Sequence, residues 1–380
     1  MKIGFDAKRF FNNFTGLGNY SRFIIRALSE HAPENDYLLF TPKVKAHAEL
    51  NSILSSPNIR VATPSYFYNL LGAGSLWRTW GISRSADAKQ LDLYHGLSQE
   101  LPINLPAYVK KIVTVHDLIF IRYPHLYKAV DAAIYKAKVQ AACRQADRII
   151  AISQQTKEDL IHFLSVEATK IDVVYQGCHP TFKKIFTSEQ ITTIRTKYDL
   201  PRHYILSVGT IEERKNVLLV IKAIALLPVD LRIHLVVVGR STDYKRKIIE
   251  QAAKLRVSQW VLFLHDVSFV DLPGIYQGAE VFVYPSIFEG FGIPIVEALE
   301  SSIPVIATKG SSLQEAGGPG TIYLDFENEQ EMCDTLKKVL SDQDLRKTMI
   351  DDGHIHVKKF EPDVIAEQVV KVYYKPKADS

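Results

Sequence analysis

The sequence has few cysteines and no long hydrophobic segment. Its three cysteines, Cys143, Cys178 and Cys333, are too widely spaced for a disulfide framework or a zinc site. This usage is typical of a reducing compartment. Apolar runs stay short of the roughly eighteen residues that a membrane-spanning helix needs, and residues 1–6 enter a strand pattern without a secretory segment. We therefore expect a cytoplasmic protein.

A strong charge of one sign is also missing. The net charge is +4, and no run of five or six like charges occurs in the 380 residues. Nucleic-acid binding therefore has no electrostatic support, and we expect no nucleic-acid partner. Apolar residues make up 47% and charged residues 23%, as in ordinary soluble globular proteins, and the length suggests about two domains.

Short apolar runs alternate with helical patterns along the chain. The expected strands form two series, at 2–6, 37–40, 59–63, 91–95, 111–116, 148–152 and 171–175, then at 203–208, 231–238, 260–265, 281–284, 304–307 and 321–324. Most are rich in Val, Ile and Tyr without strict alternation, which is typical of parallel strands buried on both faces. The expected helices between them include 18–32, 125–146, 156–164, 216–227, 243–255 and 293–301. The pattern predicts an α/β fold with two doubly wound, Rossmann-like domains.

The domain boundary is expected near 178–202, a less apolar and proline-containing connection. We predict an N-terminal domain at 1–178 and a C-terminal domain at 179–361, with the C-terminal helix at 362–380 packing back on the first domain. Two such domains would face one another across a cleft, which is a usual place for a ligand.

Two carboxylates flank a glycine turn in the segment YPSIFEGFGIPIVEALESSIP, residues 284–304. The apolar run 281–284 predicts a buried strand, and 293–299 has helical spacing. Glu289 and Glu297 therefore stand on either side of a strand–loop–helix junction. A helix start suits phosphate, while carboxylates can accept hydrogen bonds from sugar hydroxyls. An ordinary loop with a surface Glu297 is the alternative.

Other polar residues follow expected strands, where ligands of open α/β sheets bind. His116 comes directly after the residues KKIVTV at the carboxyl end of the expected strand. It can exchange a hydrogen bond with a hydroxyl near neutral pH, or it can be a structural histidine. Asp117 can cap the next turn. Gly16 and Gly18 lie at a helix start, although Ser21 stands where a dinucleotide fingerprint needs its third glycine.

Arg214 and Lys215 precede the helix at 216–227. Cations are unfavourable at a helix N-terminus, and a bound diphosphate would remove this conflict. Solvated surface charge is the alternative.

These segments together resemble the glycosyltransferases of the GT-B fold, in the large retaining family 4. The resemblance covers most of the chain, in the segments TGLGNYSR, VTVHDLIFIRYP, ADRIIAISQQTKEDLI, KIDVVYQG, ILSVGTIEERKN, LVVVG and VFVYPSIFEGFGIPIVEALESSIPVIAT, and in the final helix. Its most diagnostic feature is the pair of glutamates separated by seven residues, Glu289 and Glu297.

The resemblance implies a role for each matching residue in binding a nucleotide sugar. Glu297 matches the carboxylate that binds the donor ribose, and Glu289 matches the one near the donor sugar. The sugar and phosphate loop corresponds to Gly290, Phe291, Gly292 and Ile293. Lys215, with Arg214 beside it, matches the lysine that holds the donor diphosphate.

In the first domain, Gly16 and Gly18 match the glycine loop that faces the diphosphate and acceptor, and His116 matches a histidine close to the donor sugar. Two departures are Thr210, where many members have arginine, and His265, where many have glycine next to the base-contacting region.

The resemblance also implies a retaining reaction without a protein nucleophile, a metal or any other cofactor. The expected donor is GDP-mannose, since VHDLIFIRYP and GTIEERKN look mannosyltransferase-like, and a UDP-sugar remains open. The acceptor is expected to be a glycan or lipid-linked glycan of envelope polysaccharide or lipopolysaccharide biosynthesis. The motif Asp342-Gln343-Asp344 reads as a helix cap and not as a metal site.

Three other functions stay open: a glycoside hydrolase, a UDP-sugar 2-epimerase on a similar fold, and a non-catalytic nucleotide-sugar-binding protein. A hydrolase needs two carboxylates about 5–9.5 Å apart but gives no reason for Arg214 and Lys215.

Residues 64–84 combine aromatic and cationic side chains, namely Tyr66, Phe67, Tyr68, Trp77, Trp80, Arg78 and Arg84. They suit either peripheral contact with a membrane or an ordinary packed helix and loop.

Overall fold

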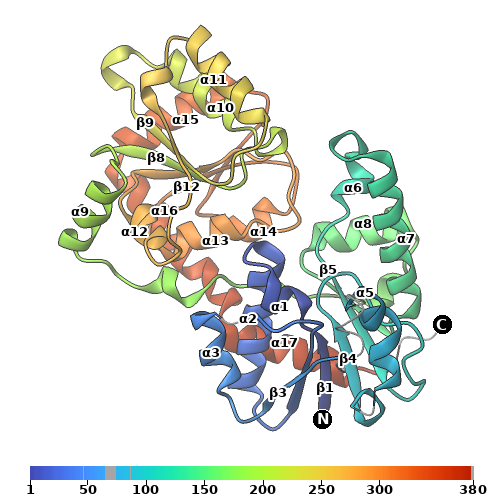
Figure 1. Ribbon diagram of the computed structural model, residues 1–380. Coiled ribbons are helices and arrows are strands. Elements are labelled where there is room, and N and C mark those ends of the chain that lie inside the picture. The colour runs from blue at the N-terminus through green and yellow to red at the C-terminus, as the bar shows by residue number, and fades with distance from the viewer. Residues whose placement is uncertain (46, 65–73, 86, 378–380) are drawn as a thin grey trace. The chain divides into compact units, whose positions relative to one another are not determined.

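The computed structural model describes residues 1–45, 47–64, 74–85 and 87–377 of the chain (Figure 1). It divides into two compact units. Unit 1 comprises residues 1–177 together with 359–380, and unit 2 comprises residues 178–358. The second unit thus ends slightly before the expected residue 361.

Unit 1 is built on a seven-stranded parallel sheet with the strand order β3-β2-β1-β4-β5-β6-β7. Its strands are β1 (Lys2–Asp6), β2 (Asp36–Phe40), β3 (Ile59–Ala62), β4 (Leu93–Gly96), β5 (Lys110–Val115), β6 (Arg148–Ala151) and β7 (Ile171–Val173). The central strands are buried on both faces, as their continuous apolar runs predict.

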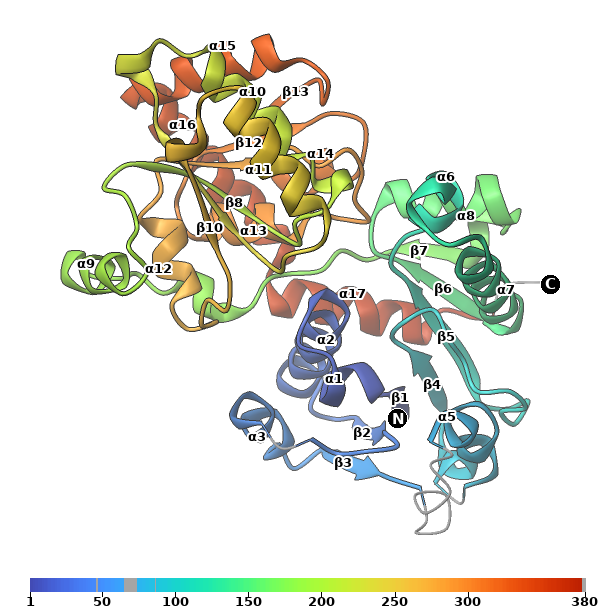
Figure 2. The same ribbon diagram turned by 45° about the horizontal axis from the view of Figure 1, so that its top comes forward.

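The α-helices of unit 1 are α1 (Lys8–Asn12), α2 (Gly16–His31), α3 (Ala48–Leu54), α5 (Gly74–Leu76), α6 (Ile119–Arg122), α7 (Ala129–Gln145), α8 (Gln154–Leu164) and α17 (Pro362–Tyr374). On one face of the sheet lie α2, α3 and α17, and on the other lie α7 and α8 (Figure 1 and Figure 2). The C-terminal helix α17 packs on α2. Its buried side chains, including Ile365, Val369 and Val372, recur at helical spacing.

Unit 2 contains a six-stranded parallel sheet with the order β10-β9-β8-β11-β12-β13. The strands are β8 (Tyr204–Val208), β9 (His234–Val238), β10 (Val261–Leu264), β11 (Val281–Tyr284), β12 (Val305–Thr308) and β13 (Ile322–Leu324). The helices are α9 (Ser188–Lys197), α10 (Val217–Leu226), α11 (Tyr244–Lys254), α12 (Leu272–Gln277), α13 (Ile293–Glu300), α14 (Leu313–Gly317), α15 (Glu329–Ser341) and α16 (Gln343–Val357). In Figure 1, α10, α11 and α15 cover one face, and α12, α13, α14 and α16 cover the other.

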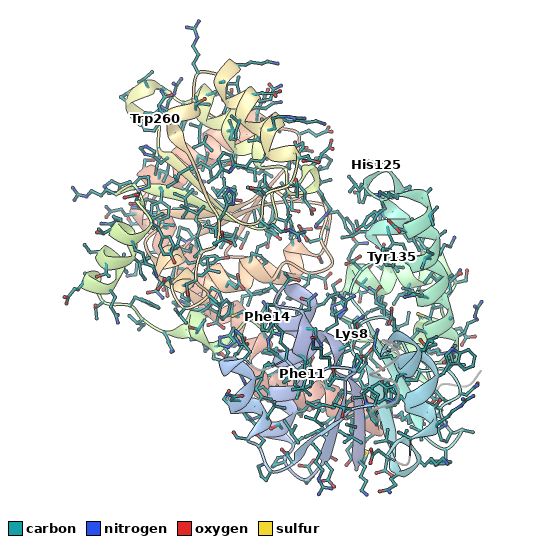
Figure 3. The ribbon with its side chains drawn as sticks, in the orientation of Figure 1. Lys8, Phe11, Phe14, His125, Tyr135 and Trp260 are labelled. Atoms are coloured by element: carbon teal, nitrogen blue, oxygen red, sulfur yellow. The ribbon has the colours of Figure 1, made fainter. Side chains whose placement is uncertain are left out.

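All thirteen expected strands are present, and the predicted fold class is confirmed. One local expectation is wrong. β9 begins at His234 and not at residue 231, because residues 229–231 form a 3-10 turn after Pro228. Between β1 and α2 the structure adds the short helix α1, which carries Lys8 and Phe11 (Figure 3).

Part of the aromatic segment 64–84 is placed. Tyr66, Phe67 and Tyr68 lie outside the described residues. Trp77 is buried, and Arg78 pairs with Asp6 and Glu100, so these two side chains serve the fold of unit 1. In the part of the chain that the structure describes, no helix is both long enough and apolar enough to cross a bilayer.

Candidate active site

The strand order of unit 2 places two neighbouring strands at the point where the sheet changes winding direction. β8 is the first strand of the unit and lies between β9 and β11. Ligands of open α/β sheets bind beyond the carboxyl ends of strands at such a point. β8 leads to a 3-10 turn at Glu213–Lys215, and β11 leads to the loop 285–292. The predicted diphosphate and sugar residues therefore follow adjacent strands.

The two basic residues after β8 meet the carboxylate after β11. Lys215 Nζ lies 2.6 Å from Glu289 Oε1 and 2.6 Å from the Tyr284 hydroxyl. Arg214 Nη1 lies 2.7 Å from the same Oε1 and donates to the Phe288 carbonyl oxygen at 2.6 Å. The side chains of Arg214 and Lys215 are only 15% and 14% exposed, so they are not solvated surface charges.

This ion cluster sets the charge state of Glu289. Burial alone would raise the pKa of its carboxyl group, but Lys215 and Arg214 outweigh burial and bring the pKa to about 2. For Arg214, the effect of burial is likewise exceeded by Glu289, and its pKa is raised. For Lys215, burial is the largest effect and lowers its pKa, with Glu289 opposing it. Glu289 is therefore ionised at neutral pH and neutralises part of the basic pair.

Hydroxyl groups hold the loop 285–292 in place. The Ser286 hydroxyl donates to Glu289 Oε1, and the Thr308 hydroxyl donates to the Ser286 carbonyl oxygen. The Ser312 hydroxyl donates to the carbonyl oxygens of Glu289 at 2.8 Å and Phe291 at 3.1 Å. We did not predict these residues from the sequence. Only Ser286 could have been found from the sequence, because it stands three residues before Glu289 in the same segment.

The glycine of the loop that begins α13 is required by backbone geometry. Gly292 has φ +117°, and a Cβ there would lie 2.9 Å from Leu313 Cδ2. The N–H groups of Gly292 and Ile293 have no hydrogen-bond partner among the described residues, so they are available to an anion at the helix start. Phe291 is buried, and Gly290 lies in the same loop, so ligand contact through backbone groups fits both.

Glu297 lies on α13 and is 8% exposed. Tyr276 of α12 donates its hydroxyl hydrogen to Glu297 Oε2 at 2.9 Å. Burial raises the pKa of Glu297 to about 7, although the Tyr276 hydrogen bond opposes this effect. Its Oε1 has no partner within the described ranges, and it can accept a hydroxyl hydrogen bond. The surface position considered for Glu297 is therefore wrong, because packing of α12 against α13 buries the side chain.

In unit 1, His116 is 6% exposed and lies directly after β5. Its Nε2 is 2.8 Å from the Leu97 carbonyl oxygen, which can only accept, so Nε2 carries the hydrogen and Nδ1 is an acceptor. Burial lowers the pKa of the ring to about 4, so it is neutral at pH 7. Asp117 Oδ1 accepts from the Ile119 N–H at 3.1 Å, as expected of a turn cap.

The two glycines at the start of α2 differ in their surroundings. A Cβ on Gly18 would lie 1.7 Å from the Asn13 carbonyl oxygen, so the local fold itself requires this glycine. A Cβ on Gly16 would meet no atom within 4 Å. Gly16 therefore leaves space for a ligand, while Gly18 lets two backbone segments approach each other.

His265 and Lys245 lie on segments that follow the strands β10 and β9. His265 Nδ1 is 2.8 Å from the Gly239 carbonyl oxygen, and Lys245 Nζ is 2.6 Å from His265 Nε2. Asp342 caps α16 by accepting from the Leu345 N–H at 2.8 Å, which confirms its predicted capping role. Within the described ranges, no group of three or more His, Cys, Asp and Glu side chains could hold a metal ion.

Comparison with known families covers most of the chain. Residues 14–182 match the family model Glycosyltransferase Family 4. Residues 190–355 match the model Glycosyl transferases group 1.

Two curated relatives are bacterial mannosyltransferases. The chain is 25% identical to O-antigen chain mannosyltransferase B of Escherichia coli, over 98% of this chain and 99% of that protein. It is 27% identical to O-antigen chain mannosyltransferase RfbU of Salmonella typhimurium, over 62% of each protein.

Solved structures share the fold at low sequence identity. The Anabaena protein Alr3699/HepE in complex with UDP aligns with a TM-score of 0.73 at 19% identity, over 98% of this chain and 99% of that one. WaaG, a glycosyltransferase involved in lipopolysaccharide biosynthesis, aligns with a TM-score of 0.72 at 17% identity, over 98% and 100% of the two chains. With two family models matched in tandem and this fold, the chain belongs to the family 4 glycosyltransferases of the GT-B fold.

Proposed function

We propose that the protein transfers a hexose, with mannose as the first expectation, from a nucleotide-diphospho-sugar to a glycan or lipid-linked glycan of the cell envelope. The observation that carries this proposal is the cluster of Arg214, Lys215 and Glu289 at the winding change of the unit 2 sheet. Two O-antigen mannosyltransferases among the relatives support mannose and an envelope polysaccharide.

The cluster suits the charge changes of glycosyl transfer. As the bond between the sugar and the diphosphate of the donor breaks, negative charge develops on the diphosphate and positive charge on the sugar. Arg214 and Lys215, with the N–H groups at the start of α13, are fixed donors for that negative charge. Glu289 stays ionised and can accept hydrogen bonds from sugar hydroxyls, while Glu297 Oε1 suits a ribose hydroxyl.

We further propose a retaining reaction on one face of the sugar, without a protein nucleophile. Glu289 is the carboxylate nearest the basic pair, but its Oε1 already accepts from Ser286, Lys215 and Arg214. Three donors on one oxygen stabilise the carboxylate charge and weaken it as a nucleophile. The configuration of the product at its anomeric carbon, measured by NMR, tests retention.

We also propose that the reaction needs no metal ion, and the support again comes from the contacts of Arg214 and Lys215. Arg214 and Lys215 supply two positive charges at the place where a metal ion would otherwise balance the diphosphate. Activity should therefore survive dialysis against EDTA, and a requirement for added Mg²⁺ or Mn²⁺ would contradict this part.

A glycoside hydrolase would also use two carboxylates of different pKa, and Glu289 and Glu297 differ in that way. A hydrolase, however, has no diphosphate leaving group, so this interpretation gives no role to the buried pair Arg214 and Lys215. Product analysis distinguishes a transferase from an epimerase and from a binding protein, since an epimerase releases an epimerised sugar and a binding protein shows no turnover.

We also propose that the segment 64–84 makes a peripheral contact with the inner face of the membrane, where a lipid-linked acceptor would lie. Support comes from the exposed side chains of Leu76, Trp80 and Arg84 in the described part of the segment 64–84. Flotation with liposomes tests it, and absence of binding with and without anionic lipid would contradict it.

A panel of nucleotide sugars tests the function itself. GDP-mannose and a set of UDP-sugars are compared for thermal stabilisation and for slow release of the sugar. A cognate donor at about 100 times its Kd should add roughly 2.7 kcal/mol of stability. A panel in which no donor stabilises the protein or is cleaved would refute the proposal.

A further inference from the structure

A chain of hydrogen bonds runs through the core of unit 1. It joins four buried side chains from four separate elements: Tyr373 of α17, His95 of β4, Thr114 of β5 and Tyr20 of α2. We call these four residues the buried chain. None of them is more than 3% exposed, and none has a part in the function proposed above.

The bonds of the buried chain are short and continuous. The Tyr373 hydroxyl lies 2.8 Å from His95 Nδ1, and His95 Nε2 lies 2.8 Å from Thr114 Oγ1. Thr114 Oγ1 in turn lies 3.0 Å from the Tyr20 hydroxyl. Burial lowers the pKa of His95 to about 3, so the ring is neutral with a single N–H. Each of the four groups then has one hydrogen to donate, which is enough for all three bonds in either direction.

Such a chain specifies geometry more than it adds stability. Apolar side chains of similar volume often fill a core at equal or lower free energy, whereas a buried polar group without a partner is costly. A fully bonded network permits one arrangement of its members. The buried chain therefore fixes α17, the two strands and α2 in a single register.

The end of the buried chain touches His116. The Tyr20 ring meets the His116 ring edge to face, with centroids 4.6 Å apart and an interplanar angle of 86°. Thr114 lies near the end of β5, and His116 follows two residues later, directly after the strand, so both face the same side where the chain is extended. The Tyr20 hydroxyl bonds to Thr114 while its ring packs on His116. Together with the bond from Nε2 to Leu97, this contact fixes the direction of Nδ1.

The far end of the buried chain is anchored as well. Lys110, at the start of β5, donates to the carbonyl oxygens of Val372 at 3.2 Å and Tyr373 at 2.7 Å. These carbonyls lie in the last turn of α17, where backbone partners run out, and the Val372 carbonyl oxygen also accepts from the Lys375 N–H at 3.3 Å. The last turn of α17 is thus held to β5 through the Lys110 side chain and to β4 through the bond between Tyr373 and His95.

We propose that the buried chain is a positioning unit, through which the C-terminal helix orients the His116 imidazole for sugar transfer. His116 presents an acceptor nitrogen to a substrate hydroxyl only while its ring keeps this orientation. This inference rests on the role proposed for His116. It adds that Tyr373, which is far from His116 in sequence, acts on the reaction through Tyr20.

The test compares Tyr373→Phe with Tyr374→Phe as the matched control, because Tyr374 is the next residue and is 64% exposed. The activity readout is the cleavage of GDP-mannose, and the binding readout is the Kd of GDP. We expect Tyr373→Phe to lower kcat about tenfold, since small misplacements of a catalytic group are costly. The Kd of GDP should be unchanged, and Tyr374→Phe should match the wild type.

A double-mutant cycle separates positioning from a general loss of stability. In a His116→Asn background, Tyr373→Phe should change kcat by less than about twofold, because the group it positions is gone. An equal loss of kcat in both backgrounds would overturn the proposal. If Tyr373→Phe fails to fold, Tyr20→Phe replaces it in the test. This variant removes the hydroxyl at the other end of the buried chain but keeps the ring, and the same changes in kcat and Kd are expected.

Histidine ¹⁵N NMR tests the coupling without any turnover. The ring nitrogens of His116, assigned with His116→Asn, should report hydrogen on Nε2 in the wild type and should shift in Tyr373→Phe but not in Tyr374→Phe. Unchanged His116 signals in Tyr373→Phe and Tyr20→Phe would refute the coupling. A wild type that cleaves no GDP-mannose would refute that donor, and the NMR result would still decide the coupling.

Discussion

At the scale of single residues, the central feature is a carboxylate shared by two cations. The sequence placed Arg214 and Lys215 before a helix and Glu289 beside a glycine turn, 74 positions after Lys215. Each position could be predicted from local pattern. Their mutual ion pairs could not, because they depend on β8 and β11 being neighbours in the sheet. Glu289 balances the charge of Arg214 and Lys215, and in the proposed function a donor diphosphate would balance it on binding.

The charge balance predicts an unusual response of Glu289→Gln. The change keeps the side-chain shape but leaves Arg214 and Lys215 without their shared acid, so the free protein should lose about 3 kcal/mol of stability. GDP should then raise the Tm of the variant more than that of the wild type, since its diphosphate replaces the lost charge. The control is Glu212→Gln, whose side chain is 38% exposed. Equal GDP-induced shifts in Tm for wild type and Glu289→Gln would contradict the prediction.

Glu297 predicts a pH dependence with a defined sign. Its pKa in the folded protein is raised to about 7, above the ordinary value of 4.5, so folding favours the protonated form. The stability linked to this group is complete below pH 4.5 and is lost as the pH rises through about 7. Glu297→Gln should therefore flatten the fall in unfolding free energy between about pH 5 and 8, which urea titrations measure. An unchanged slope in the variant would show that Glu297 does not titrate in this range.

Binding should show the opposite sign at the same residue. In the proposed function, ribose hydroxyls donate to the ionised Glu297 carboxylate, so the affinity for GDP should rise with pH through about 7. Tyr276→Phe removes the hydrogen bond that favours the ionised form and should move this rise to higher pH. Calorimetric titrations at a series of pH values measure both effects, and a midpoint that does not move in Tyr276→Phe would contradict the account.

At the scale of elements, the sequence was informative wherever one local signal decided the structure. Strands buried on both faces appear as short runs of Val, Ile and Tyr, which is why both sheets could be predicted. Polar contacts that cross between elements leave no such signal. The bond between Tyr276 of α12 and Glu297 of α13, and the bracing of the loop 285–292 by Ser312, became visible only in the structure.

The start of α2 offers a matched pair of glycine substitutions. In Gly18→Ala the new Cβ would fall 1.7 Å from the Asn13 carbonyl oxygen, so the backbone must shift, at an expected cost of about 1–3 kcal/mol. Gly16→Ala meets open space and should leave stability within about 0.5 kcal/mol. Urea unfolding of the two variants measures the difference. Equal stabilities would mean that the two glycines are not distinguished by packing.

At the scale of the whole molecule, the chain contains two doubly wound units, each with its own candidate residues. Unit 2 brings together the basic pair and the two glutamates, and unit 1 holds His116 and the glycines of α2. The family could be inferred from the sequence because its motifs follow consecutive strands over most of the chain. Acceptor identity and linkage follow from no motif along the chain, and His265, where many family members have glycine, leaves the donor base open.

One measurement tests the central claim most directly, namely that Lys215 acts on the diphosphate of a nucleotide sugar. Release of nucleoside diphosphate from GDP-mannose and the UDP-sugars is followed for the wild type, Lys215→Ala and the surface control Lys222→Ala, whose side chain is 45% exposed. We predict that at least one donor is cleaved by the wild type. Lys215→Ala should lose at least about tenfold in rate with its fold intact, and Lys222→Ala should keep full activity. A Lys215→Ala variant that cleaves the donor at the wild-type rate would contradict the account.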